Sequence, residues 1–210
     1  MKRDFDEIRA FIEREIVPRY DEFDAGHNRD HVLTVISQAL SLAQYYPEVD
    51  RCMLLVAAAY HDLGLDFGRE KHHIHSAAII REDRRLDQWF APQEIETIAD
   101  AAEDHRASSN HEPRTIYGRI VAEADRIIDS ETIVRRALQY GMRHEPGLDR
   151  EGQYRRLMEH MQEKYAAGGY LKLWIPHGEN ACRLEEFRKI LDNEQAFRQL
   201  FDTIYDSLNR

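Results

Sequence analysis

The chain has 210 residues, of which 42% are hydrophobic and 32% charged, and its formal net charge at pH 7 is −10. This length fits one domain, or one domain with an appended helical part, and the apolar content is sufficient for a buried core. The negative charge provides no overall basic field, which argues against binding of a nucleic-acid polymer. The N-terminus lacks an apolar signal-peptide core, and the longest apolar run, Cys52 to Tyr60, is too short to span a bilayer. We therefore expect a cytoplasmic protein without membrane spans.

The first half of the sequence predicts five amphipathic helices from apolar residues at three- and four-residue steps. These helices cover about residues 4–17, 28–46, 51–62, 70–83 and 92–105. Pro18 and Pro47 end the first two helices, and Pro92 begins the fifth. Asp50 fits the N-cap of the third helix, which ends in a histidine and an aspartate side by side.

The second half also predicts only helices. One begins near Ile116, contains Asp125, and continues or restarts as far as Gly141. Two further helical regions cover about residues 151–166 and 180–208, the second broken at Asp192-Asn193. No run shows the alternation with β-branched residues that is typical of strands. The sequence therefore predicts an all-α fold.

The segment from Arg143 to Gly152 contains a proline and two glycines and is the best candidate for a hinge. We accordingly predict a helical domain over residues 1–142. Residues 143–210 are then expected to form a C-terminal helical extension packed on the same core.

Four polar residues stand out against the apolar helices that contain them. His61 and Asp62 end the third helix, His31 opens the second directly before its apolar stripe, and Asp125 is flanked by alanines and isoleucines. Burying an imidazole or a carboxylate is costly unless something compensates it. A metal ion does so, because histidine nitrogen and aspartate oxygen are both ordinary ligands. If these helix positions converge, they form a divalent-metal site.

In their order and helical placement these residues resemble the HD superfamily of metal-dependent phosphohydrolases, of the bacterial type. The resemblance covers about residues 24–135, with Asp125 in an Ala-x-Ala-Asp-Arg-Ile setting, and His27 matches an extended form common in bacterial members. It implies an HD-domain-like helical bundle in which one divalent ion is bound by His31, His61, Asp62 and Asp125. Such mixed ligation does not select among Mn, Fe, Co, Ni, Mg and Zn.

Some members of this superfamily hold a second ion through two further histidines that lie between the His-Asp pair and the last aspartate. The resemblance makes His72 and His105 the candidates here, with His75 as the competitor of His72. His72-x-x-x-Ser76-Ala77 is similar to the family's His-x-x-x-Gly-Ala pattern, with serine in place of glycine. If both sites were filled, Asp62 could bridge the two ions.

The four ligands leave coordination positions open, as a hydrolytic metal requires. Together with this, the resemblance implies hydrolysis of a small phosphorylated substrate, expected to be a nucleotide, by a metal-activated water. Phosphoryl transfer depends on positioning and charge neutralisation, so basic side chains should lie near the ligands. Arg29 and Lys71 are the preferred candidates. His105 or His72 could protonate the leaving oxygen when it is not a ligand.

Two other functions stay open on the sequence. Certain HD-type proteins with six ligands use two irons to activate oxygen, and this chain could be a di-iron oxygenase of that kind. Alternatively, it could be a metal-stabilised binding or regulatory module whose C-terminal helices contact a partner. The apolar residues of the last helix could also serve a homodimer. The other histidines singled out fall in loops or on polar faces and are expected at the surface: His111, His144, His160 and His177.

Overall fold

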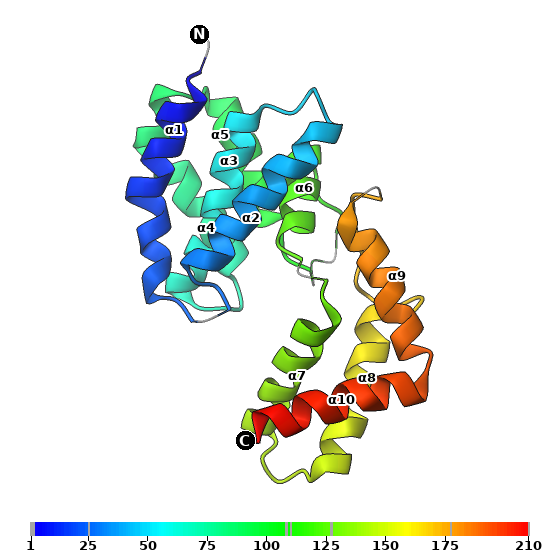
Figure 1. Cartoon of the computed structure of the whole chain (residues 1–210). Coiled ribbons are helices and arrows are strands. Elements are labelled where there is room, and N and C mark those ends of the chain that lie inside the picture. The colour runs from blue at the N-terminus through cyan, green and yellow to red at the C-terminus, as the bar shows by residue number, and fades with distance from the viewer. Residues whose placement is uncertain are drawn as a thin grey trace. The chain divides into compact units, whose positions relative to one another are not determined.

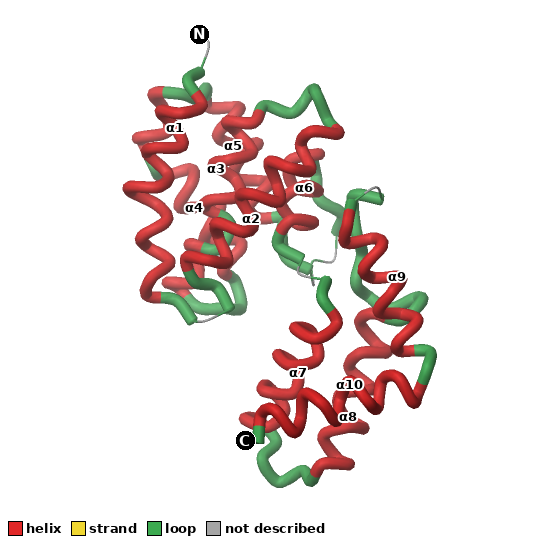
Figure 2. The backbone as a smooth tube through the Cα atoms, viewed as in Figure 1, coloured by secondary structure: helices red, strands yellow, loops and turns green. Residues whose placement is uncertain are grey.

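The computed structural model describes residues 3–24, 26–107, 109, 111–126, 128–176 and 178–209. Within these ranges the backbone forms helices joined by turns and loops, and no strand (Figure 2). The all-α prediction is therefore confirmed. By spatial proximity the chain divides into two compact units, Met1–Asp125 and Arg126–Arg210 (Figure 1).

The first unit begins with a helical segment whose hydrogen-bond pattern changes twice. The α-helix α1 (Phe5–Phe11) is followed by a π-helix over Ile12–Ile16 and a 3-10 helix over Val17–Glu22. The sequence predicts one helix over residues 4–17, and Pro18 explains the difference. Proline lacks an N–H and its ring clashes with the carbonyl four residues earlier, so the α-helical ladder cannot continue. The backbone N–H of residue 17 instead bonds to the oxygen of residue 12.

The central helix of the first unit is α3 (Arg51–Tyr60). As predicted, Asp50 caps it, with its side chain accepting from the N–H groups of Cys52 and Met53. Every residue from Cys52 to Tyr60 is buried, as is typical of a helix that is apolar on all sides. The α-helices that contact it include α1, α2 (Arg29–Leu42), α4 (His72–Glu82), α5 (Pro92–Glu103) and α6 (Ile116–Ala124). This packing fixes the C-terminal end of α3 inside the unit.

A short connection joins α3 to the next helix. The 3-10 turn Leu63–Phe67 leads into α4 (His72–Glu82), which packs on this turn and along α5. Two further 3-10 segments, Ala43–Tyr45 and Arg84–Gln88, follow α2 and α4. The helices around α3 thus bring several chain segments that are distant in sequence to its C-terminal end.

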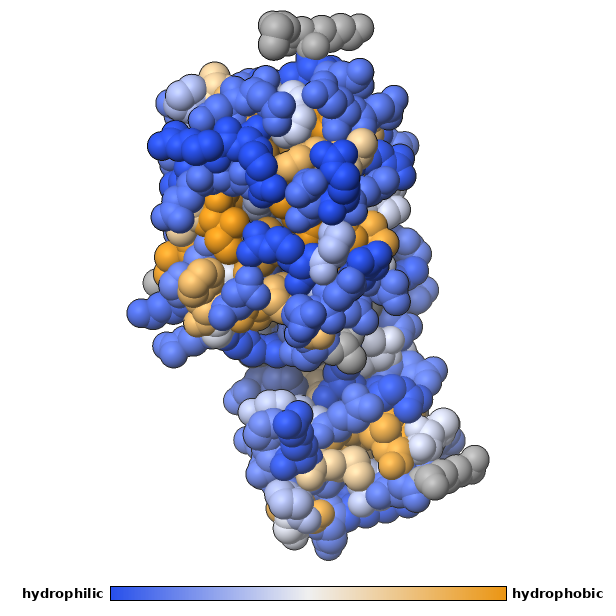
Figure 3. All heavy atoms as spheres, turned by 90° about the vertical axis from the view of Figure 1, so that its left-hand side faces the viewer, coloured by the Kyte–Doolittle hydropathy of each residue, from blue (hydrophilic) through white to orange (hydrophobic). Residues whose placement is uncertain are grey.

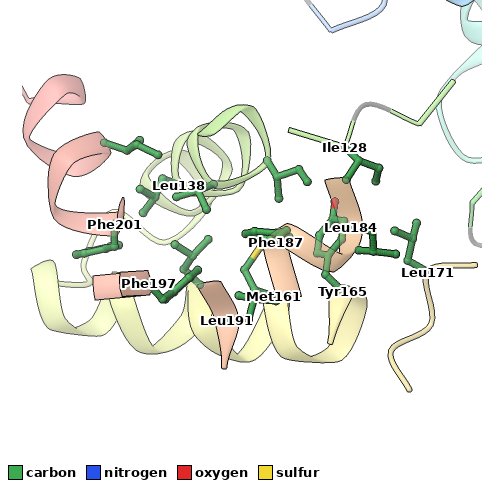
Figure 4. Close-up of a cluster of buried hydrophobic side chains, with 14 of the residues drawn as sticks. Ile128, Leu138, Met161, Tyr165, Leu171, Leu184, Phe187, Leu191, Phe197 and Phe201 are labelled. Atoms are coloured by element: carbon green, nitrogen blue, oxygen red, sulfur yellow. The ribbon is translucent and has the colours of Figure 1, made fainter. Parts of the chain in front are cut away.

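The second unit has a hydrophobic core of its own. Its helices are α7 (Ser130–His144), α8 (Arg150–Tyr165), α9 (Glu179–Leu191) and α10 (Glu194–Leu208). Figure 4 shows the buried side chains that these helices share, among them Leu138, Met161, Phe187, Phe197 and Phe201. Since each helix contributes to the cluster, residues after 126 can bury a core without using α3.

The observed helix boundaries refine two expectations. The chain restarts after α6, with Asp129 capping α7 through a bond from the N–H of Thr132. The break after α9 is capped by Asn193. Because α7 packs against α8 and α10, residues 130–142 lie with the second unit, whereas the predicted domain over 1–142 includes them. The predicted hinge over 143–152 coincides with the connection between α7 and α8. The predicted domain boundary at residue 142, and the predicted packing of residues 143–210 on the core of the first domain, stay predictions.

The outer faces of the helices carry the charged residues. Hydrophilic residues predominate on the face shown in Figure 3, with hydrophobic residues scattered among them. Among the described residues, no helix combines the length and the apolar character needed to cross a bilayer.

Candidate metal centre

The end of α3 presents His61 and Asp62 to the interior of the first unit. His61 is fully buried, and its Nδ1 lies 2.8 Å from the carbonyl oxygen of Ala58, one turn back on the same helix. Donation of the Nδ1 proton to this carbonyl leaves Nε2 with its lone pair directed away from the helix. Asp62 follows directly and is 3% exposed. The helix end therefore supplies one nitrogen and two oxygens as possible ligands.

Two other helix termini add to this pair. Asn28 caps α2 by accepting from the N–H of His31, which places His31 in the first turn of α2. Asp125 is the C-cap residue of α6. Nε2 of His31 lies 3.1 Å from Oδ1 of Asp125 and 3.6 Å from Oδ2 of Asp62. The predicted convergence of His31, His61, Asp62 and Asp125 is observed, and we call these four residues the first group.

The spacing of the first group fits a shared cation. Nε2 of His61 lies 3.1 Å from Oδ2 of Asp62 and 3.7 Å from Oδ1 of Asp125. An ion about 2.1 Å from each ligand holds neighbouring ligand atoms about 3.0 Å apart in octahedral and about 3.4 Å apart in tetrahedral geometry. The observed distances lie in or close to this range.

The buried imidazoles of this group also carry polar atoms without hydrogen-bond partners. Among the described residues, Nε2 of His61 and both ring nitrogens of His31 are buried and make no hydrogen bond of regular geometry, although each of the two Nε2 atoms lies 3.1 Å from a carboxylate oxygen. Buried polar atoms are usually paired, so such atoms at one point require an explanation. A divalent ion provides it, because nitrogen and carboxylate oxygen form a standard donor set. The residues present therefore fit the metal that the sequence analysis predicts.

Burial and charge act in opposite directions on these groups. Burial lowers the pKa of His61, but the carboxylates of Asp62 and Asp125 outweigh it and raise this pKa well above its usual value. The pKa of His31 is raised in the same way. Burial raises the pKa of Asp62, but the His61 imidazole and the other histidines nearby hold it well below its usual value. The carboxylates thus favour protonation of these imidazoles, and a metal ion bound by them competes with protons.

A second group lies on the other oxygen of Asp62. Oδ1 of Asp62 is 3.4 Å from Nε2 of His72 and 3.4 Å from Nε2 of His105, and these two nitrogens are 3.0 Å apart. Burial and the neighbouring His105 lower the pKa of His72 to about 4, so its ring is neutral at pH 7. We call Asp62, His72 and His105 the second group. Asp62 belongs to both groups, one oxygen to each.

The turn after Asp62 positions α4, and with it His72. The N–H of Gly64 donates to Oγ of Ser76 at 2.9 Å in a buried bond. A Cβ at position 64 would lie 2.0 Å from the carbonyl oxygen of His72, so only glycine fits this approach. The ring of His75, the competing candidate, packs against Phe67 with centroids 5.1 Å apart. The structure therefore brings His72, rather than His75, to Asp62.

The end of α5 is anchored by an ion-pair network. The side chain of Asp104 is fully buried and accepts from Arg114 through the backbone N–H at 2.6 Å and through Nη2 at 2.8 Å. Arg114 also pairs with Asp100 at 2.9 Å. His105 follows Asp104, and its Nδ1 contacts the carbonyl oxygen of Ala102. This network fixes the loop that carries His105.

The basic candidates lie outside both groups. Arg29 is exposed and forms a two-point ion pair with Asp21, with distances of 2.9 Å and 2.6 Å. Lys71 is exposed at the N-cap position of α4, one residue before His72. His27 lies next to the first group, with its ring centroid 5.9 Å from that of His31. Its Nδ1 is 2.8 Å from a carboxylate oxygen of Asp24.

The remaining histidines show a mixed outcome. His111 and His144 are exposed as predicted, whereas His160 is half-buried. His177 lies outside the described residues.

Sequence reasoning missed Tyr20, which lies at the candidate centre. It is fully buried, and its hydroxyl contacts backbone groups on both sides of His61. No local pattern distinguishes this tyrosine, since it follows a proline in a polar stretch far from the ligands in sequence. Sequence reasoning also missed the contact of Gly64 with Ser76. The glycine directly after the His-Asp-Leu sequence is a signal that another backbone segment approaches closely at this position.

One comparison with known proteins gave a match. A family model described as HD domain matches residues 28–128 of the chain. The search of curated proteins and the search of solved structures returned no match. The matched segment contains every residue of the first and second groups. It begins after Tyr20 and ends before α7.

Proposed function

The chain belongs to the HD superfamily through residues 28–128, and on this premise we propose that it is a phosphohydrolase that acts on a small phosphorylated substrate, with nucleotides as the expected class. HD domains are generally metal-dependent hydrolases. The observation that carries the proposal is the division of Asp62 between two sets of possible ligands, one on each carboxylate oxygen. A phosphate group carries several anionic oxygens, which two adjacent cations can neutralise together.

In the proposed enzyme His31, His61, Asp62 and Asp125 would hold one divalent ion, and His72 and His105 would hold a second together with Asp62. A bound ion supplies a water of lowered pKa and polarises a phosphoryl oxygen. The protein's part is to orient the donors. In His61, His72 and His105 the Nδ1 atom contacts a backbone carbonyl oxygen, which directs the Nε2 atom into the centre.

The basic side chains would contact the substrate rather than the ions. Lys71 precedes a proposed ligand, and its ammonium group makes no hydrogen bond or ion pair among the described residues, so this group is available for a phosphate oxygen. Arg29 would first have to exchange its pairing with Asp21 for the substrate. His105 can hold either an ion or a proton at Nε2. Proton donation by His105 to the leaving oxygen therefore belongs to a form with one ion.

The test is elemental analysis of metal-replete protein, followed by a phosphate-release screen that includes nucleotides. Asp62→Asn keeps the side-chain shape but removes the shared carboxylate, and we expect it to lower both metal content and turnover by more than about a hundredfold. Asp66→Asn is the matched control. Asp66 lies in the turn that follows Asp62, is exposed, and forms an ion pair with Arg19. Full activity of Asp62→Asn would refute the proposal.

The di-iron oxygenase stays the second candidate, because six histidine and aspartate side chains contribute to the two groups. Iron content together with a visible absorption band in air would favour it, and phosphate release without oxygen would oppose it. A melting temperature raised by metal, without hydrolysis of any phosphate compound, would favour the regulatory module. The cytoplasmic location and the homodimer stay predictions from the sequence.

A further inference from the structure

Tyr20 reaches the candidate centre from outside the segment that matches the HD domain. It lies in the 3-10 helix Val17–Glu22, whereas the match begins at residue 28. Its hydroxyl donates to the carbonyl oxygen of Ala59 at 2.8 Å and accepts from the N–H of Asp62 at 3.3 Å. One hydroxyl thus connects the carbonyl group directly before Tyr60 with the N–H group directly after His61.

These two backbone groups lie where α3 gives way to the turn. The carbonyl of Ala59 is among the last four of the helix, which have no partner within a regular α-helix. The N–H of Asp62 belongs to the first residue after the C-cap of α3. The preceding carbonyl, that of Ala58, is already used by His61. Tyr20 therefore sets the direction in which the backbone of Asp62 leaves the helix.

The ring of Tyr20 is held on two sides. It stacks on the His61 imidazole with centroids 6.5 Å apart and an interplanar angle of 29°, and Phe23 meets it edge-on at 5.3 Å. The side chain is fully buried, and both hydrogen bonds of its hydroxyl go to backbone groups. Its hydroxyl is therefore committed to the backbone and not directed at a reacting group.

We propose that Tyr20 is a positioning residue for the metal centre, which extends the functional site into the helical segment before the HD domain. The inference rests on the proposed function, because it concerns an ion held by His61 and Asp62. A residue that only filled the core would affect stability alone. A positioning residue also affects how well the His-Asp pair meets the ion, because partners that orient ligands typically change metal affinity by about ten- to a hundredfold.

Tyr20→Phe in the full chain removes only the hydroxyl. We expect this variant to bind Zn²⁺ about ten- to a hundredfold more weakly than the wild type in calorimetric titrations at constant pH. Its Co²⁺ complex should also show a changed visible spectrum. Tyr60→Phe is the matched control, since Tyr60 is equally buried and its hydroxyl bonds to the Asp83 side chain at 2.7 Å instead of the turn. It should lower the melting temperature and leave Zn²⁺ affinity unchanged.

The outcomes separate the inference from the proposed function. If the wild type binds Zn²⁺ and Tyr20→Phe binds it equally well, the inference is wrong and the proposed function is unaffected. If the wild type binds no divalent ion, the proposed function fails and the inference with it. If Tyr20→Phe does not fold, 3-fluorotyrosine placed at position 20 replaces it. Its ¹⁹F resonance should then move on saturation with Zn²⁺, and an unchanged resonance would overturn the inference.

Discussion

Replacing Gly64 by alanine tests the packing that joins the two groups of possible ligands. Gly64 lies in the turn after Asp62, against the first turn of α4. A Cβ at this position would lie 2.0 Å from the carbonyl oxygen of His72, 2.6 Å from the nitrogen of Ser76 and 2.8 Å from Cβ of His75. Two of these three atoms belong to the backbone, so a change of rotamer cannot relieve the contact.

The size of the effect follows from these distances. Ordinary contact begins at 3.4 Å, so the first turn of α4 must retreat by about 1.4 Å from Gly64. Overpacking of this kind costs about 1–3 kcal/mol, and loss of the buried bond from Gly64 to Ser76 costs a similar amount. We expect Gly64→Ala to lower the free energy of unfolding by about 2–6 kcal/mol. The same retreat would carry His72 away from Asp62, while the first group keeps its four residues.

Urea denaturation measures the stability, and elemental analysis measures the number of bound ions. If the wild type binds two ions, Gly64→Ala should bind one. The control is Gly147→Ala, because a Cβ at this exposed position meets nothing within 4 Å and its φ is not positive. A Gly64→Ala variant that is as stable as the control and keeps both ions would refute the close approach of the turn to α4.

Three further predictions concern other parts of the molecule. Arg114→Met leaves the buried carboxylate of Asp104 without its guanidinium partner and should lower the free energy of unfolding, measured by urea denaturation, by about 3 kcal/mol. A decrease below about 1 kcal/mol would contradict a stabilising role of this ion-pair network. Phe201→Ala should destabilise the second unit by about 3–5 kcal/mol and leave Zn²⁺ affinity unchanged, so a weaker affinity would show that the metal centre depends on that core. Burial lowers the pKa values of His31 and His61, but the carboxylates outweigh it and raise both pKa values. Protons therefore compete with the ion even above pH 6.5, and Zn²⁺ affinity should keep rising with pH there. An affinity that is constant between about pH 6.5 and pH 7.5 would contradict these shifts.

The parts of the site that could be predicted from sequence are those with a local signal. An uninterrupted apolar stretch predicts a helix buried on all sides, and α3 is such a helix. Asp50 is its N-cap because a carboxylate there can accept from the first free N–H groups. His61-Asp62 at its end then has to be buried as well. The order of the candidate ligands along the chain resembles that of the HD superfamily, and this resemblance implies His31 and Asp125 as their partners.

The parts that could not be predicted depend on contacts between distant segments. Nothing near Tyr20 indicates that its hydroxyl meets residues about forty positions later, because the π-helix and the 3-10 helix that bring it there arise from Pro18 and the surrounding packing. The sequence leaves the restart at Ser130 open, since the apolar residues on both sides fit one continuous helix. Asp129 resolves it by capping a new helix, which belongs to the core of the second unit.

The orientation of the histidines shows why helix ends, rather than helix middles, carry this centre. His61, His72 and His105 each contact a carbonyl oxygen three residues earlier, that of Ala58, Arg69 and Ala102 respectively. In the middle of an α-helix this carbonyl is bonded within the helix, whereas at an end or in a turn it can accept from a side chain. His31 is the exception, because its Nδ1 has no hydrogen-bond partner among the described residues. Its ring is oriented by the carboxylate of Asp125, 3.1 Å from its Nε2, and by packing that includes the edge-on contact with His27, but by no backbone carbonyl at Nδ1. Among the proposed ligands it is therefore the one whose orientation should respond most to a bound ion.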